Sequence, residues 1–296
     1  MRRNLFRVVA LALAGLALFW GLTRPGTVPE KAMAAVTGDA TRGELVFHAG
    51  GCASCHAAPD ASGAARLILS GGQKFPSPFG TFLAPNISPD PVHGIGSWSP
   101  RDLASAMRYG TSPTGAHYYP AFPYTSYAHA SLGDIADLHS FLATLPASDV
   151  PSQPHEIGFP FSIRRGLGLW KRLFAGKPWV LGGDLNEQLT RGRYLVEGLG
   201  HCSECHTPRN AIGGLDRSRW MAGAPSPNGK GKVPNLTPAK LRWSEKDIAY
   251  YLETGFTPDF DAAGGHMASV VLNTGQLPAG DRAAIAAYLK ALAPIE

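Results

Sequence analysis

The pentapeptide Cys-x-x-Cys-His occurs twice in this chain of 296 residues, at positions 52–56 and 202–206, and it contains all four cysteines. Two thiols at this spacing can add to the two vinyl groups of one haem, and the next residue, a histidine, can then give an imidazole nitrogen to the iron. The motif therefore predicts two covalently attached haem c groups. The predicted haem anchors are Cys52, Cys55, Cys202 and Cys205, and the predicted proximal iron ligands are His56 and His206.

A zinc site, a redox-active dithiol and ordinary disulfides are the alternatives for these cysteines. Zinc ribbons place their two Cys-x-x-Cys knuckles about 15–20 residues apart, whereas most of the chain separates Cys55 from Cys202. Neither a dithiol nor a pair of disulfides gives a reason for a histidine after each pair. The haem interpretation is therefore preferred.

The N-terminus indicates export. Arg2, Arg3 and Arg7 surround the start of an apolar segment that has no charge over residues 8–22. Residues 32–34 resemble a small-residue cleavage site, but the charged and proline-containing segment before them is long for a signal peptide. We expect an uncleaved anchor in the bacterial inner membrane with the rest of the chain on the periplasmic side. Cleavage would instead leave a soluble periplasmic protein.

The net charge of +5 misleads, because most of the excess lies in the first 31 residues. The remaining residues contain 22 basic and 21 acidic side chains. They show no long run of like charge, and so the sequence predicts no nucleic-acid partner.

The two haem motifs lie in matching contexts, which predicts an internal repeat. The matching segments are 41–46 with 190–196, 85–89 with 234–238, 98–103 with 243–248, and the closing helices 133–145 with 280–292. Ser99 and Ser244 are placed as helix N-caps, and Gly110 and Gly255 as the glycines that end the same helices. Each unit is expected to have a helix ending in the haem motif, a middle helix, a ligand loop and a final helix.

This pattern predicts an all-α fold of two tandem haem-binding domains behind an N-terminal helix. No strand-like alternation is long enough to suggest a sheet. The predicted divisions are an anchor and tether at 1–35, a first domain at 36–147, a linker with a short amphipathic helix at 148–187, and a second domain at 188–296.

A methionine is the expected distal ligand of the second haem, haem 2. Met267 lies in a glycine-containing loop before the last helix, which makes it the best candidate. The neighbouring His266 is expected to be a solvated loop residue or a hydrogen-bond donor at the haem edge.

The first haem, haem 1, differs because the repeat places Phe122 opposite Met267, and phenylalanine cannot bind iron. His117 in the same loop is the predicted ligand, and Met107 is a second candidate. A third possibility is that iron has no distal protein ligand. His93 and His129 are weaker candidates.

With both units in view, the chain resembles the cytochrome c subunits of bacterial membrane-bound dehydrogenases, such as the alcohol and gluconate dehydrogenases. Those subunits have a tyrosine- and proline-rich loop in which the ligand methionine lies between Pro-Ala and Pro-Tyr. Here the loop reads Pro120-Ala121-Phe122-Pro123-Tyr124, with phenylalanine at that position. The resemblance covers residues from about 36 to the C-terminus. It implies that Asn86 and Asn235 bond near a haem propionate or fix their loop, although both are also ordinary turn residues.

The resemblance implies an electron-transfer subunit with no catalytic residues of its own. It would take electrons from a dehydrogenase or another redox protein and pass them to the respiratory chain. The alternative is an oxidoreductase similar to thiosulfate dehydrogenase, in which haem 1 has an open or weakly held coordination position and His117 lies beside it.

Overall fold

The computed structural model describes residues 2–226 and 231–296, and helices dominate this part of the chain. The first half contains α2 (Glu30–Met33), α3 (Ala40–Ala49), α4 (Cys52–His56), η1 (Gly63–Leu67), α5 (Pro100–Tyr109), α6 (Tyr124–Tyr127) and α7 (Leu132–Leu142). The linker contains η2 (Arg164–Gly166) and α8 (Leu167–Phe174). The second half contains α9 (Glu187–Arg193), η3 (Tyr194–Leu199), α10 (Ser203–His206), η4 (Arg217–Arg219), α11 (Glu245–Thr254), α12 (Gly265–Thr274) and α13 (Ala279–Ala291).

Two helix crossings organise the two halves in the same way. α3 packs against α7, and α9 packs against α13. A glycine lies at each crossing, because a Cβ atom on Gly43 would lie 2.0 Å from the carbonyl oxygen of Asp137, and one on Gly192 would lie 2.1 Å from that of Ala284. Arginines next to these glycines add ion pairs to the crossings, Arg42 with Asp137 and Arg191 with Asp281.

The predicted helix boundaries of the middle helices are confirmed. Ser99 and Ser244 form capping boxes at the starts of α5 and α11, with aspartate in the third helical position. Gly110 and Gly255 end these helices in the left-handed conformation, with φ of 59° and 80°. The sequence could predict these helix ends because each capping partner lies within four residues.

The secondary structure contains two features that the sequence patterns did not predict. Short antiparallel strands are present: β1 (Lys74–Ser77), β2 (Gly80–Leu83) and β3 (Glu156–Ile157) form one sheet in that order, and β4 (Ala224–Pro225) pairs with β5 (Lys232–Val233). These strands are too short to show alternation. In addition, the expected ligand loop of the second half is largely helical, because α12 begins at Gly265.

The N-terminal helix α1 (Arg2–Leu22) projects away from the body of the molecule, and none of its residues is buried. It is long and apolar enough to cross a membrane, although a signal sequence would have the same length and composition. The residues that follow α1 are different, because Thr23 is fully buried and Val28 is 2% exposed. The Val28 amide donates to the Ser105 hydroxyl, and its carbonyl accepts from Arg101.

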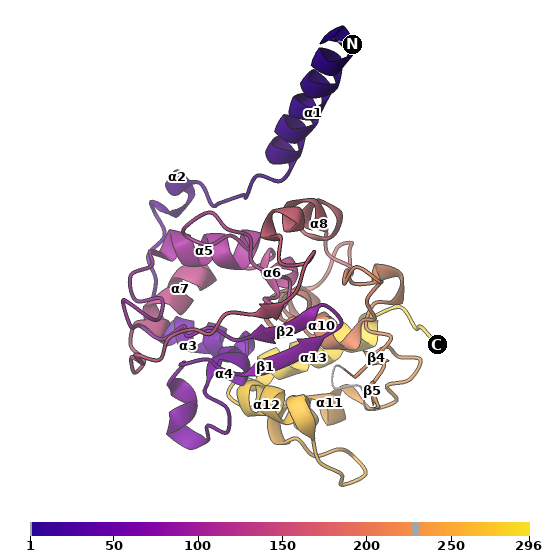
Figure 1. Cartoon of the computed structure of the whole chain (residues 1–296). Helices are drawn as coiled ribbons and strands as arrows, with labels where there is room; N and C mark the ends of the chain where they lie inside the picture. The colour runs from indigo at the N-terminus through magenta and orange to yellow at the C-terminus, as the bar shows by residue number, and fades with distance from the viewer. Residues whose placement is uncertain (1, 227–230) are drawn as a thin grey trace.

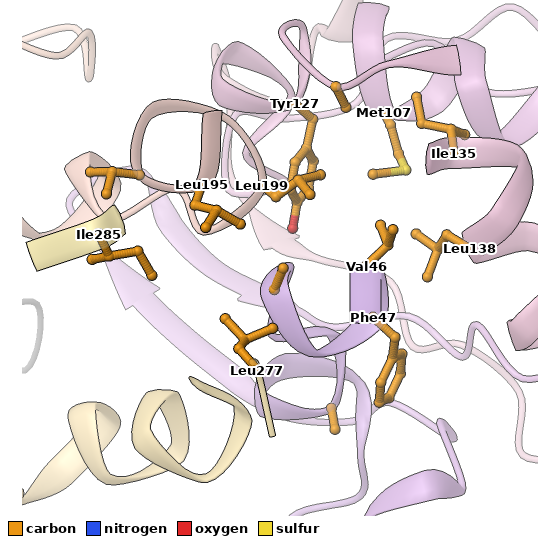
Figure 2. Packing of buried hydrophobic residues seen from close by; sticks show 14 of the residues in the cluster. Val46, Phe47, Met107, Tyr127, Ile135, Leu138, Leu195, Leu199, Leu277 and Ile285 are labelled. Carbon is orange, nitrogen blue, oxygen red and sulfur yellow. The ribbon is translucent and has the colours of Figure 1, made fainter. Parts of the chain in front are cut away.

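One hydrophobic cluster includes side chains from both halves. Figure 2 shows Leu195, Leu199 and Ile285 of the second half on one side of Tyr127, with Met107 and Val46 on the other. The two haem motifs lie at the edge of this shared cluster, since Cys52 and Cys202 pack against it.

Candidate haem-binding sites

Each haem motif forms a short helix after a sharp change in backbone direction. In the first half, Gly51 adopts the left-handed conformation between α3 and α4, with φ of 60°. In the second half, His201 takes that conformation before Cys202, with φ of 40°. The positive φ at these two residues separates each motif helix from the helix before it.

The two motif histidines have the same hydrogen-bond partner in both halves. His56 Nδ1 lies 2.9 Å from the carbonyl oxygen of Pro85, and His206 Nδ1 lies 2.8 Å from that of Pro234. A carbonyl oxygen can only accept, so Nδ1 carries the proton and Nε2 has a free lone pair. A histidine that ligates a metal through Nε2 is commonly oriented in this way. Burial also lowers the pKa of both imidazoles, which keeps them neutral.

The two asparagines fix the loops that carry those carbonyls. Asn86 donates from Nδ2 to the carbonyls of Ser148 and Val150, each at 2.8 Å, and accepts from the Ser88 amide. Asn235 donates to the carbonyl of Ile295 at 2.7 Å and accepts from the Thr237 amide. The side chains of both asparagines therefore hold these loops to distant backbone carbonyls, and a contact with a haem propionate stays a prediction.

The cysteines are suited to thioether attachment. All four are free, and Cys205 is exposed at the surface. Burial raises the pKa of the Cys52 thiol and of the Cys202 thiol to about 12. In the part of the chain that the structure describes, no group of three or more histidine, cysteine or acidic side chains is placed to hold a metal ion. The residues therefore fit haem attachment better than a zinc site.

Each haem motif forms hydrogen bonds with a helix of the other half. Ser54, inside the first motif, accepts a hydrogen bond from Asn273 on α12 and donates to the Ser269 carbonyl. Glu204, at the corresponding position of the second motif, accepts from the hydroxyls of Thr125 and Ser126 on α6. Each motif thus contacts the helix that follows the ligand loop of the other half.

A shared carbonyl also links the two motifs. The Gly50 carbonyl accepts from the Tyr127 hydroxyl at 3.2 Å and lies 3.3 Å from His201 Nε2. The rings of Tyr127 and His201 meet edge to face, with their centroids 5.5 Å apart. The backbone before Cys52 is therefore bound directly to the residue before Cys202.

Met267 lies in the first turn of α12 and is half-buried against the hydrophobic cluster. Its neighbour His266 is exposed and stacks on Phe75 of β1, with ring centroids 6.3 Å apart.

The backbone pairing before the ligand loops also supports the alignment of the two halves. The bridge between Thr111 and His117 corresponds to the bridge between Phe256 and Ala262, which leaves Phe122 opposite Met267.

Comparison with known proteins identifies the family. No family model matches the chain. A dihaem c-type cytochrome of Cereibacter sphaeroides is 61% identical over the full length of both chains. The chain belongs to the dihaem c-type cytochromes. It therefore binds two covalent haem c groups and functions in electron transfer.

Cytochrome subunits of dehydrogenases are further relatives. The fructose dehydrogenase cytochrome subunit of Gluconobacter japonicus is 37% identical over 85% of this chain and 52% of that subunit. The cytochrome c subunit of the quinone-dependent alcohol dehydrogenase of Gluconobacter oxydans is 36% identical over 85% of this chain and 54% of that subunit. The present cytochrome thus spans about half the length of these dehydrogenase subunits.

The candidates for the distal ligand of haem 1 have other partners in this cytochrome. His117 is 3% exposed, and its Nε2 donates to the Thr23 carbonyl at 2.8 Å, whereas its Nδ1 has no hydrogen-bond partner. Met107 packs among Ile135, Leu138 and Val46 (Figure 2). His129 stacks on Trp179 at 3.8 Å. The sixth ligand of haem 1 therefore stays a prediction.

Sequence reasoning missed the residues that join the two haem motifs. Ser54, Tyr127, His201 and Glu204 contact partners 77 to 219 residues away, so no local pattern reports them. The sequence signal for Ser54 and Glu204 was their position inside the motifs. Both occupy the second variable position of Cys-x-x-Cys-His, at which any residue is allowed.

Proposed function

We propose that this cytochrome is anchored in the bacterial inner membrane by α1 and carries electrons on the periplasmic side, from a dehydrogenase to the respiratory chain. The observation that carries the proposal is the pair of motif histidines, both held by loop carbonyls, in motifs whose preceding residues Gly50 and His201 are in hydrogen-bond contact. Such an arrangement fixes two haems in one rigid unit. The dehydrogenase subunits among the relatives support a partner of that class.

The proposed iron ligands are His56 and His206 on the proximal sides and Met267 on the distal side of haem 2, with His117 as the candidate for haem 1. The haems supply one-electron oxidation and reduction, and a methionine ligand raises the potential relative to a second histidine. The chain's own groups orient the ligands: Pro85 and Pro234 hold the imidazoles, and Asn86 and Asn235 hold the prolines' loops.

An uncleaved N-terminus is part of this proposal. Thr23 and Val28 are buried in the body of the protein, and the Thr23 carbonyl is the partner of His117 Nε2. Cleavage after residue 34 would remove both and leave a buried imidazole without a partner, at a cost of about 1–3 kcal/mol. The intact mass of the protein extracted from membranes should equal the full chain plus two haems. A mass that begins near residue 35 would overturn the anchor.

Membranes from cells that produce the cytochrome test its role as a carrier. Addition of an alcohol or of fructose should reduce both haems in membranes that contain the matching dehydrogenase, and oxygen should reoxidise them. The same membranes without the cytochrome should lose this coupling. If no dehydrogenase substrate changes the haem absorption, although dithionite does, the proposed role is wrong.

A second function is favoured by the surroundings of haem 1. Phe122 takes the place that Met267 has in the other half, and Nε2 of His117 is bonded to Thr23. An open iron position would let a small sulfur compound bind. Thiosulfate added to the purified cytochrome, with no other protein, should then reduce the haems. No reduction under these conditions, together with the membrane result above, excludes this alternative.

A further inference from the structure

The positive charge of this protein is concentrated in two segments. Residues 1–29 contain four basic and no acidic residues, and residues 157–183 contain five basic and no acidic residues. The rest of the chain contains 18 basic and 22 acidic residues. The first segment is the α1 helix with the residues after it. The second includes η2 and α8, which lie next to the base of α1 in Figure 1.

Direct contacts bind the second segment to the last turn of α1. Arg165 donates to the Trp20 carbonyl at 2.6 Å, and its guanidinium lies 4.1 Å from the centre of the Trp20 ring. Arg172 donates to the Leu22 carbonyl, also at 2.6 Å. Gly168 completes the contact, because a Cβ atom there would lie 2.6 Å from the Cα of Thr23. The last carbonyls of α1 thus have partners on the linker.

The length of α1 fixes where these contacts lie relative to a membrane. Its 21 residues span about 31 Å at 1.5 Å per residue, which matches the roughly 30 Å of a hydrocarbon core. If α1 spans the membrane, Leu22 lies at the periplasmic boundary. Arg165 and Arg172 are bonded to carbonyls of the last turn, so η2 and α8 must lie at the level of the lipid headgroups.

Large apolar side chains are exposed on this same segment. Phe159, Phe161 and Ile163 precede η2, and Leu169 and Leu173 lie one turn apart on α8. These five side chains, which we call the juxtamembrane patch, are between 41% and 83% exposed. The opposite side of α8 is engaged with the protein, because Trp170 donates to the Ile212 carbonyl and Lys171 donates to those of Tyr109 and Gly110.

We infer that the juxtamembrane patch inserts into the interfacial region of an anionic phospholipid bilayer, and that α1 and the patch together hold the protein in one orientation on the membrane. Exposed apolar groups beside an excess of cations, in a segment that contains no acidic residue, are the features of an interfacial lipid-binding segment. Cations beside the bilayer surface would attract anionic headgroups. The inference rests on the proposal that α1 remains in the membrane.

Spin labels on the full-length holoprotein test this inference in phosphatidylcholine vesicles that contain phosphatidylglycerol. Single cysteines would be introduced by Leu173→Cys in the patch, Leu11→Cys in α1 and Phe260→Cys in the second half. Phe260 is the matched control, because it is also apolar and is 94% exposed. The accessibility of each label to oxygen and to a water-soluble nickel complex reports its depth.

The inference predicts that the label at position 173 is protected from the nickel complex several-fold more than the label at 260, and that protection decreases in vesicles of phosphatidylcholine alone. Equal nickel accessibility at 173 and 260, with the label at 11 protected, would show that the juxtamembrane patch does not insert into lipid although α1 lies in the membrane. Full nickel accessibility at 11 would instead overturn the anchor itself. Protection at 173 only after a dehydrogenase is added would show that a protein, and not lipid, covers the patch.

Discussion

At the residue scale, each haem motif depends on a histidine and on an asparagine at the same positions of the repeat. The sequence predicted both histidines, because the Cys-x-x-Cys-His spacing is set by the chemistry of one haem. It placed the asparagines but left their role open. That role depends on Ser148, Val150 and Ile295, which lie about 60 residues from the asparagines that they contact.

Replacement of Asn86 by alanine should affect haem 1 and leave haem 2 unchanged. The variant loses three hydrogen bonds in a site that is 3% exposed, so the free energy of unfolding should fall by roughly 2 kcal/mol or more. The Pro85 carbonyl would be less well fixed, so the midpoint potential of haem 1 should shift. Denaturant unfolding and a redox titration measure the two effects.

The control is Asn235→Ala, which should shift the potential of haem 2 alone because Asn235 fixes the Pro234 loop. Equal shifts at both haems in either variant would show that the asparagines act on overall stability and not on one histidine.

At the scale of elements, the predictable features were those with partners close in sequence, such as the capping boxes and glycine ends of α5 and α11. The short strands and α12 were not predictable, because β1 to β3 are two to four residues long and β3 pairs with a strand more than 70 residues away. The close helix crossings at Gly43 and Gly192 were predictable only in part. The repeat marked both glycines, but only the structure shows what they contact.

Gly43→Ala should destabilise the protein strongly. The new methyl group would meet the Asp137 carbonyl at 2.0 Å, so α3 and α7 must separate. Overpacking of this kind costs typically about 1–3 kcal/mol, and the midpoint temperature of the holoprotein should fall by several degrees. Gly280→Ala is the matched control, since beyond the local backbone of α13 no atom lies within 4 Å of its added Cβ. Equal midpoints for the two variants would contradict the close crossing.

At the scale of the whole molecule, the two halves form one body through contacts that the repeat could not reveal. The sequence predicted two similar units but not how they meet, because the hydrogen bonds between the halves join residues 79 or more positions apart. His129 belongs to this boundary. It stacks on Trp179 of the linker, and Gly198 of the second half lies beside its Cβ.

Acid should weaken the boundary between the halves through His129. Burial, and then the positive charges of Arg217, Arg108 and Arg193, lower the pKa of His129 to about 4. In the unfolded chain a histidine takes up its proton near pH 6.5. The unfolded state therefore binds more protons between about pH 6.5 and pH 4, and stability falls as the pH falls through this window.

The variant His129→Phe keeps a ring to stack on Trp179 and cannot be protonated. Its midpoint temperature should fall less between pH 7.5 and pH 5 than that of the parent protein. His93→Phe, in a turn of the first half, serves as the control. If it changes the acid dependence as much as His129→Phe does, the effect is not specific to His129. An unchanged acid dependence in His129→Phe would show that other groups cause it.

The ligation of the two haems is best tested by a spectroelectrochemical titration of the full-length protein and of Met267→Leu, followed by absorption and electron paramagnetic resonance. We expect two one-electron components in the parent. In the variant, leucine keeps the apolar bulk but removes the sulfur ligand, so one haem should lose its low-spin signal and its potential should fall, while the other is unchanged. A single component in the parent, or two haems that are both unaffected by Met267→Leu, would contradict the account.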